Sequence, residues 1–313
     1  MPVKIRPRKL NRARLREQEL KQAEQNRKNA AKYKKEIERL YKQSLREVQK
    51  EIEFQYNKYA TEHGFTLADA KRRLSKADAR EWMEANDNWK ANPHSVEAQE
   101  DYELIDAKAQ INRLELIKAK IGLLLLEHQE VLDEYFHGRL TEEAVRELEK
   151  QAGIFGDFIG VNLPERIEAM VNEPFYDAVW SDRIWQYQDD LKHDLEKMLT
   201  KALVIGRNPK HPEFVKELQK TFGVSQYRAE TLLVTEMARV QTSAQKFSFL
   251  HNGYEEYEFI CCGGGAGGNP NDPCKDCQEL DGQVFKVSEM QPGENAAPKH
   301  PGCHCSCSAY YRN

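Results

Sequence analysis

The cysteines limit most strongly how this chain can fold, because all seven of them lie after residue 260 of 313. Cys274 and Cys277 form a Cys-x-x-Cys pair. After 22 further residues the sequence reads His300-x-x-Cys303-x-Cys305-x-Cys307, which offers more candidate ligands than one ion needs. An odd number of cysteines and no recognisable export signal argue against a disulfide framework. Clustering at one end instead favours a local metal site.

The spacing of the cluster is typical of a structural zinc ion held by four Cys or His ligands. The first choice of ligands is Cys274, Cys277, His300 and Cys305, with Cys303 as a close competitor for one place. Residues 253–313 contain few aliphatic side chains and many glycines, so they bury little core on their own. A structural Zn²⁺ contributes on the order of 10 kcal/mol of folding free energy. We therefore expect one structural Zn²⁺ in this segment.

Two other interpretations of the cluster stay open at this point. The thiols could be reduced and unliganded, or the zinc could be catalytic. Zinc deaminases carry His-x-Glu followed by Pro-Cys-x-x-Cys, and Pro273 to Cys277 fits the second half. His211-Pro-Glu213 and His128-Gln-Glu130 fit the first half formally, but both lie far upstream. That interpretation also leaves His300, Cys303 and Cys305 without a role, so a structural ion is preferred.

Upstream of the cluster, apolar residues at steps of three and four predict a mainly helical chain. The stripe from Tyr33 to Tyr59 predicts one helix over residues 10–63, ended by Gly64. Thr66 with Asp69, and Ser75 with Asp78, predict helix starts of the capping-box type. The run Asn92 to Ser95 predicts a break. The remaining predicted helices are 96–137 closed by Gly138, a helix from Thr141 to Gly153, one from Ser181 to Leu203, one from Pro212 to Gly223, and one from Ser225 to Leu250.

Glycines and prolines in residues 153–180 predict a connector that packs aromatic side chains, namely Phe155, Phe158, Phe175 and Trp180. After residue 253 the pattern changes. Residues 254–260 alternate and predict a strand, 261–273 predict a flexible glycine-rich loop, and 282–287 predict a second strand of a hairpin. The expected fold is mainly α, with long N-terminal helices, a helical body and a small C-terminal α+β module stabilised by zinc. We expect segments 1–64 (basic arm), 65–206 (helical body) and 207–313 (C-terminal domain).

Charge is spread unevenly along the chain. Residues 1–50 hold 17 lysines and arginines against 6 glutamates, a net charge of +11, whereas the whole chain carries −4. A basic arm on an acidic body is typical of a chain that contacts a polyanion. We expect weak, salt-sensitive, sequence-independent DNA contact through residues 1–50, or else a solvated helix face.

Two kinds of targeting segment are not expected from the sequence. The longest aliphatic run, Leu123 to Leu126, is far shorter than the roughly 20 residues of a membrane span. Met1 is followed by charged residues rather than by the apolar core of a signal peptide. The expectation is a protein that first acts in a cytoplasm.

The C-terminal motif resembles that of phage Mu F-like minor head proteins, also called head morphogenesis or minor capsid proteins. The residues that carry the resemblance are Cys274-Lys-Asp-Cys-Gln-Glu-Leu-Asp-Gly-Gln-Val-Phe285 and His300-Pro-Gly-Cys-His-Cys305. Thr235-Glu236 stands where the family has a Thr-Glu pair on a long helix. The chain departs from the family at Asp272, where an Arg is usual, and at His304, where the family has Cys-Arg-Cys. Cys261, Cys262 and Cys307 look like additions.

The resemblance implies a structural virion component without catalytic activity. The protein is expected in the host cytoplasm during assembly and, in the virion, in the head interior at the portal. The implied partners are the phage portal protein and other head proteins, with DNA contact during packaging or ejection. Two alternatives remain: a zinc-stabilised nucleic-acid-binding protein of another kind, and a zinc-dependent hydrolase or deaminase.

Overall fold

The computed structural model describes residues 9–62, 64–156, 163–262 and 274–312. Within these residues the chain forms nine α-helices, one 3₁₀ turn and three β-strands. It divides into two compact units, each made from several stretches of chain. Unit 1 comprises Met1–Lys35, Tyr135–Asp182 and Glu230–Asn313, and unit 2 comprises Glu36–Glu134 and Arg183–Ala229. The predicted segment boundaries at 64/65 and 206/207 stay a prediction.

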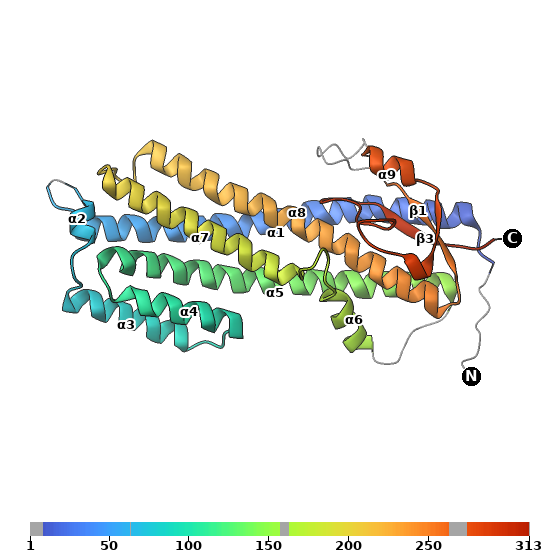
Figure 1. The fold of residues 1–313 in the computed structure, drawn as a ribbon, viewed down its shortest axis with the longest axis horizontal. Helices are drawn as coiled ribbons and strands as arrows, with labels where there is room; N and C mark the ends of the chain where they lie inside the picture. The colour runs from blue at the N-terminus through green and yellow to red at the C-terminus, as the bar shows by residue number, and fades with distance from the viewer. Residues whose placement is uncertain (1–8, 63, 157–162, 263–273, 313) are drawn as a thin grey trace. The chain divides into compact units, whose positions relative to one another are not determined.

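The helices are α1 (Arg12–Tyr59), α2 (Leu67–Ala70), α3 (Lys76–Lys90), α4 (Val96–Ala109), α5 (Arg113–Phe155), α6 (Leu163–Val171), α7 (Trp180–Val204), α8 (Pro212–His251) and α9 (Lys275–Leu280). The strands are β1 (Glu256–Ile260), β2 (Val284–Lys286) and β3 (Ser306–Tyr310). The predicted fold class is confirmed: the chain is mainly helical, with a small sheet near the C-terminus (Figure 1).

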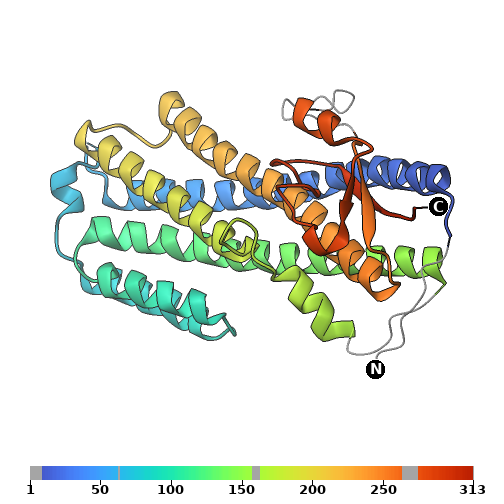
Figure 2. The same cartoon turned by 45° about the vertical axis from the view of Figure 1, so that its right-hand side comes forward.

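Unit 1 holds the sheet and the helical segments that support it. The strand order is β2-β1-β3, and both pairings are antiparallel. In register, Tyr257 of β1 lies between Phe285 of β2 and Ala309 of β3. Figure 2 shows the sheet beside the C-terminal part of α8, with α9 on the connection between β1 and β2. The unit's core joins Phe249 of α8 to Tyr257 and to the buried cysteines of the C-terminal segment.

The predicted strands over 254–260 and 282–287 are confirmed within narrower bounds, as β1 and β2. Helix α9 and strand β3 are not in the sequence prediction. Strand β3 is short and contains two serines and a cysteine (Ser306-Cys-Ser-Ala-Tyr310), so no apolar run marks it. It forms because its backbone pairs along five residues of β1. Most of the predicted glycine-rich loop, residues 263–273, lies outside the described residues, as does Phe158.

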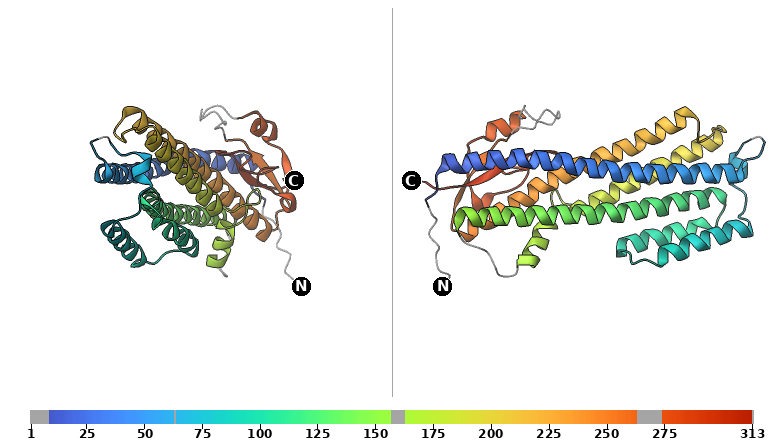
Figure 3. Two further views of the ribbon diagram at one scale, coloured as in Figure 1. Left: turned by 60° about the vertical axis from the view of Figure 1, so that its left-hand side comes forward. Right: turned by 180° about the vertical axis from the view of Figure 1, so that it is seen from behind.

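Unit 2 contains the helices that the capping signals predict. Thr66 and Asp69 form a capping box at α2, and Ser75 and Asp78 form another at α3. Helices α3 and α4 form a hairpin that packs on the first half of α5 (Figure 3). Its core stacks Trp89 on Tyr102, with ring centroids 4.2 Å apart.

The predicted helix over 96–137 begins correctly at Val96, but it is two helices rather than one, and its predicted end is wrong. The chain breaks after α4, and α5 begins at Arg113 because the side chain of Asn112 accepts a hydrogen bond from the backbone N–H of Glu115 at 3.1 Å. Gly138 does not close the helix and Thr141 does not open a new one. Helix α5 continues because Phe136, Leu140, Ala144 and Leu148 extend its buried face past the glycine.

The two predicted helices over 212–223 and 225–250 are a single helix, α8. Ser225 is not a helix cap. Its buried hydroxyl lies 3.0 Å from the hydroxyl of Tyr41 on α1, within unit 2. Ser181 is likewise inside α7, which begins at Trp180. The predicted connector over 153–180 contains helix α6, although Phe155, Phe175 and Trp180 are buried as expected.

None of the helices in the described part of the chain has a stretch that is long and apolar enough to cross a lipid bilayer.

Candidate metal centre

Helix α9 positions the Cys-x-x-Cys pair. Cys274 is its N-cap, and the Cys274 sulfur accepts a hydrogen bond from the backbone N–H of Cys277 at 3.3 Å. The cap residue and the third residue of a helix lie on the same side of its first turn. Both sulfurs therefore face one side of α9, with Cys274 half-buried and Cys277 buried.

The second half of the cluster lies in the turn that leads into β3. The backbone N–H of Cys303 donates to the carbonyl of His300 at 3.1 Å, which closes a tight turn. Gly302 has a φ of +72° in this turn, a conformation that favours glycine. The turn places His300, Cys303 and Cys305 next to α9.

The structure brings all five predicted ligands into two overlapping groups. In the first group the ligand atoms of Cys274, Cys277 and His300 lie within 4.8 Å of one another. In the second group the same holds for Cys277, Cys303 and Cys305. Cys277 belongs to both groups, and its sulfur lies 4.0 Å from that of Cys303. This C-terminal Cys/His cluster could hold a metal ion, whereas the choice among the five ligands stays a prediction.

His300 is oriented as a metal ligand would be. Its Nδ1 lies 2.9 Å from the carbonyl oxygen of Pro301, which can only accept a hydrogen bond. In the neutral ring Nδ1 therefore carries the proton, and Nε2 keeps a free lone pair. Nε2 is buried and has no hydrogen-bond partner within the described residues. A metal-binding histidine commonly fixes its tautomer through its other nitrogen in this way, so the donor set fits a metal.

The thiols influence one another strongly. Hydrogen bonds from Cys277 and Cys305 lower the pKa of Cys303 well below its ordinary value. The pKa of Cys305 is raised, first by its contact with Cys261 and then by Cys277 and Cys303. One buried thiol is thus favoured as a thiolate, the form that binds metals.

Cys261 contacts Cys305 at the edge of the cluster, a neighbour that the sequence pattern did not predict. It follows β1 directly, and its backbone N–H donates to Oδ1 of Asp281 at 2.8 Å. Cys261 lies outside the family motif, so the motif did not indicate it as a ligand. The signal that could have identified it is its position at the end of the predicted strand, beside the predicted loop. Cys307 is fully buried in β3 and belongs to neither ligand group.

The Thr235-Glu236 pair on α8 connects the helix to this cluster. The Thr235 hydroxyl donates to the carbonyl of Thr231 at 2.7 Å and accepts from the backbone N–H of Gly302 at 2.9 Å. Glu236 pairs with Arg239 at 2.5 Å. The Arg239 guanidinium also donates to the last two carbonyls of α6, those of Met170 and Val171, at 2.8 and 2.7 Å. The pair thus has a structural explanation within unit 1.

A buried polar network fixes the residue that follows Cys305. The Ser306 hydroxyl donates to Glu19 of α1 at 2.6 Å and accepts from Gln241 and Gln245 of α8 at 2.8 and 3.0 Å. Lys150 of α5 contacts the same Glu19 carboxylate at 2.9 Å. The start of β3 is therefore held by three helices of unit 1.

The deaminase interpretation gains no support from these positions. His128 and His211 belong to unit 2, whereas the cysteines belong to unit 1. In the part of the chain that the structure describes, neither histidine joins a group that could hold a metal. Burial lowers the pKa of His128 to about 4, which keeps that ring neutral.

The comparisons with known proteins agree with the motif. Residues 193–308 match the family described as Phage Mu protein F like protein. No curated protein and no solved structure matches the chain. The matched region runs from α7 through β3 and includes Thr235, Glu236 and all seven cysteines. Over residues 193–308 the chain therefore matches the phage Mu protein F-like family, which is consistent with a phage head protein.

Proposed function

We propose that the chain is a structural, non-enzymatic minor head protein of a tailed bacteriophage. It acts in head morphogenesis at the portal and the head interior, and in DNA packaging or ejection. The family match over residues 193–308 carries this proposal. It is supported by a cluster whose neighbours serve packing: Thr235 holds the His300–Cys303 turn, and Arg239 holds the end of α6.

The metal in this proposal is one structural Zn²⁺. Three considerations support zinc: thiol and imidazole donors are its usual ligands, the central sulfurs are buried, and the surrounding sheet is small. Closed sites of this kind stabilise the fold, whereas catalytic zinc keeps one position open to water. The ligands would come from Cys274, Cys277, His300, Cys303 and Cys305.

The portal partnership is tested by co-expression of the tagged chain with the portal protein of the same phage. We expect the portal protein to be retained with the tagged chain through affinity and size-exclusion steps. The control is the same portal protein expressed with an untagged chain. Recovery of a folded, metal-loaded chain without any portal protein would contradict the proposed partner.

A zinc-stabilised nucleic-acid-binding protein of another kind is the second candidate, and the charge of residues 1–50 favours it. Part of that charge is already neutralised within unit 1. Arg12 and Arg16 both pair with the buried Glu258, at 2.6 and 3.0 Å. Lys28 pairs with Glu24 along α1. The co-expression experiment distinguishes the two candidates, because only a minor head protein is expected to retain the portal protein.

A zinc hydrolase or deaminase is the third candidate. The variant Cys277→Ser distinguishes it from a protein with a structural zinc ion. If the zinc is structural, this variant loses zinc and stability together. A variant that stays folded and stable but loses a hydrolytic activity would instead identify a catalytic ion.

A further inference from the structure

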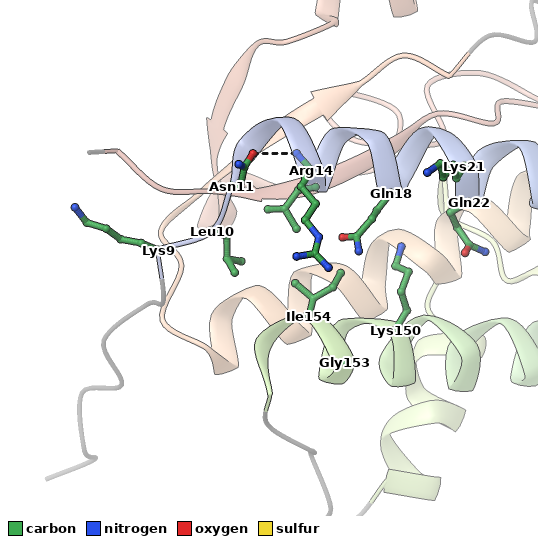
Figure 4. A pocket seen from close by; sticks show the side chains of 11 residues that line it. Lys9, Leu10, Asn11, Arg14, Gln18, Lys21, Gln22, Lys150, Gly153 and Ile154 are labelled. Carbon is green, nitrogen blue, oxygen red and sulfur yellow. Dashed lines mark hydrogen bonds between the residues drawn. The ribbon is translucent and has the colours of Figure 1, made fainter.

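A cationic groove lies in unit 1 between the first turns of α1 and the last turns of α5. Its volume is about 770 Å³. Figure 4 shows Arg14 and Gln18 extending from α1 toward α5, and Lys150 extending from α5 toward α1. Lys9 and Lys21 line the groove as well. This groove is separate from the metal cluster, and the inference drawn from it deepens the DNA-handling part of the proposed function.

Lys150 apart, the cationic side chains on this groove are not balanced by a buried carboxylate. Among the described residues that line the groove there is no aspartate or glutamate. Within the described residues Lys9 and Arg14 have no carboxylate partner, and both are exposed. Lys21 pairs only with Glu17, an exposed neighbour one turn away. Such an exposed pair is weak and is screened by salt, so Lys21 remains available to a ligand.

Other basic residues near the groove do have carboxylate partners. Arg12 and Arg16 have carboxylate partners on the C-terminal module: Arg12 pairs with Glu258, and Arg16 pairs with Glu258 and Asp281. Lys150 is committed to Glu19 and Glu147. The first turns of α1 therefore have cations that stabilise the fold and others, lining the groove, that have no such role.

The chemistry of the groove suits phosphate oxygens. Arg14 offers a planar guanidinium, Lys9 and Lys21 offer ammonium groups, and Gln18 offers an amide donor. Arg14 and Lys21 are seven residues apart on the helix, which separates them by about 10 Å. That length matches the rise of about three nucleotides along one DNA strand. A row of cations of this length favours a polyanion over a single phosphate.

The lining also indicates how such a polyanion would be recognised. The described residues that line the groove include no aromatic side chain, so they offer no surface on which bases could stack. Contacts to the backbone alone carry no sequence information. We propose that this groove binds the phosphodiester backbone of double-stranded DNA without reading its sequence.

The test is fluorescence anisotropy with a labelled mixed-sequence duplex and the full chain, over a range of salt concentrations. The groove variant is Lys9→Ala/Arg14→Ala/Lys21→Ala. The matched control is Lys28→Ala/Arg39→Ala/Lys42→Ala, which removes the same charge from exposed positions on the same helix. These positions are all exposed, so both variants are expected to fold, as circular dichroism and metal content would verify.

We expect the groove variant to bind at least about tenfold more weakly at low salt, with the control close to the wild type. The slope of log affinity against log salt should fall by about 2 to 3, because about three phosphate contacts are lost. If both triple variants bound DNA equally weakly, the DNA would be attracted by the basic helix in general, and the proposal of a binding groove would be wrong. Lack of wild-type binding would overturn it too, as would a groove variant that binds normally.

Polyglutamate serves as a second probe. If it binds the wild type through the same three residues while DNA does not bind, the groove takes an acidic protein segment and the DNA proposal is wrong. None of these outcomes depends on the portal partnership, because neither triple variant touches the family-matched region, residues 193–308.

Discussion

The backbone N–H of Gly302 donates a hydrogen bond to the hydroxyl of Thr235, at 2.9 Å. These residues are 67 positions apart, and the bond joins the centre of α8 to the turn that carries His300 and Cys303. Thr235 is therefore part of the support of the candidate metal cluster. This relationship leads to a direct mutational test.

We predict that Thr235→Val weakens the metal centre. The substitution keeps the side-chain volume but leaves the Gly302 N–H without its acceptor, which costs about 1–3 kcal/mol if water does not replace it. The turn should loosen, so zinc should be lost to a chelator more readily. The measurement is the rate of zinc transfer to a chromogenic chelator together with urea unfolding.

Thr242→Val is the matched control on the same helix. The Thr242 hydroxyl is buried and has no hydrogen-bond partner within the described residues. Replacing an unsatisfied hydroxyl by a methyl group is expected to be neutral or stabilising. If the two variants released zinc equally fast, the bond to Gly302 would have no part in supporting the centre.

We predict that Cys277→Ser removes most of the bound zinc. Cys277 belongs to both ligand groups, so four of the five four-ligand sets that these five residues allow include its sulfur. Structural zinc contributes on the order of 10 kcal/mol, so the C-terminal module should unfold locally. Metal analysis and hydrogen exchange over β1 to β3 measure these effects.

Cys307→Ser provides the comparison for that prediction. Cys307 is equally buried and lies two residues after Cys305, but it is in neither ligand group. It should retain zinc, at a modest cost from placing a hydroxyl in the core. Chelation of the wild type should reproduce the Cys277→Ser exchange pattern. A chelated protein with unchanged protection would show that the cluster needs no metal.

We predict that Arg239→Leu is among the more damaging single changes in unit 1. It removes one side of the buried ion pair with Glu236 and frees the carbonyls of Met170 and Val171 at the end of α6. Breaking a buried pair from one side typically costs about 3–5 kcal/mol. Equilibrium unfolding in urea measures the loss.

Arg228→Leu on the same helix is the control. Arg228 pairs with Asp190 at an exposed position, where such pairs contribute about 0–1 kcal/mol. The double variant Glu236→Gln/Arg239→Leu should be less destabilised than Arg239→Leu alone, because no buried carboxylate is left uncompensated. Equal losses in the Arg239 and Arg228 variants would contradict the assigned role.

Local sequence signals predicted a large part of this fold. The capping boxes at Thr66 and Ser75 and the long stripe of α1 depend on neighbours within one helix, so they can be recognised without tertiary structure. The cysteine spacing predicted the cluster for a similar reason. The cap of α9 positions Cys277 and the tight turn after His300 positions Cys303, and each of these features depends only on neighbouring residues.

The predictions of helix ends and strands were wrong where contacts between distant residues outweigh the local sequence signals. Ser225 has the chemistry of a cap, but its hydroxyl bonds to Tyr41, which is 184 residues away. Gly138 costs α5 only about 1 kcal/mol, which the buried face around it outweighs. Strand β3 exists because β1 pairs with it, and neither its composition nor its length indicates this partner.

We predict that Glu147, a fully buried carboxylate on α5, makes the stability of the protein depend on pH. Burial, together with the nearby Glu19 charge, outweighs the pairing with Lys150 and raises the pKa of Glu147 to about 7 from an ordinary value of 4.5. Between these two values the folded state holds a proton that the unfolded state has released. The free energy of unfolding therefore falls as pH rises through this window, by up to about 3 kcal/mol.

Glu147→Gln removes this titration while keeping an oxygen that can accept from Gln151, as Glu147 does at 2.7 Å. We expect the variant to gain stability relative to the wild type as pH rises from about 5 to about 8. Glu149→Gln, at an exposed position of the same helix, should show no such trend. Taking the difference between variant and wild type at each pH cancels the pH dependence of metal binding, because all three proteins share the same cluster. A difference for Glu147→Gln that stays constant over this range would mean that the carboxylate is ionised in the folded protein, held by Lys150.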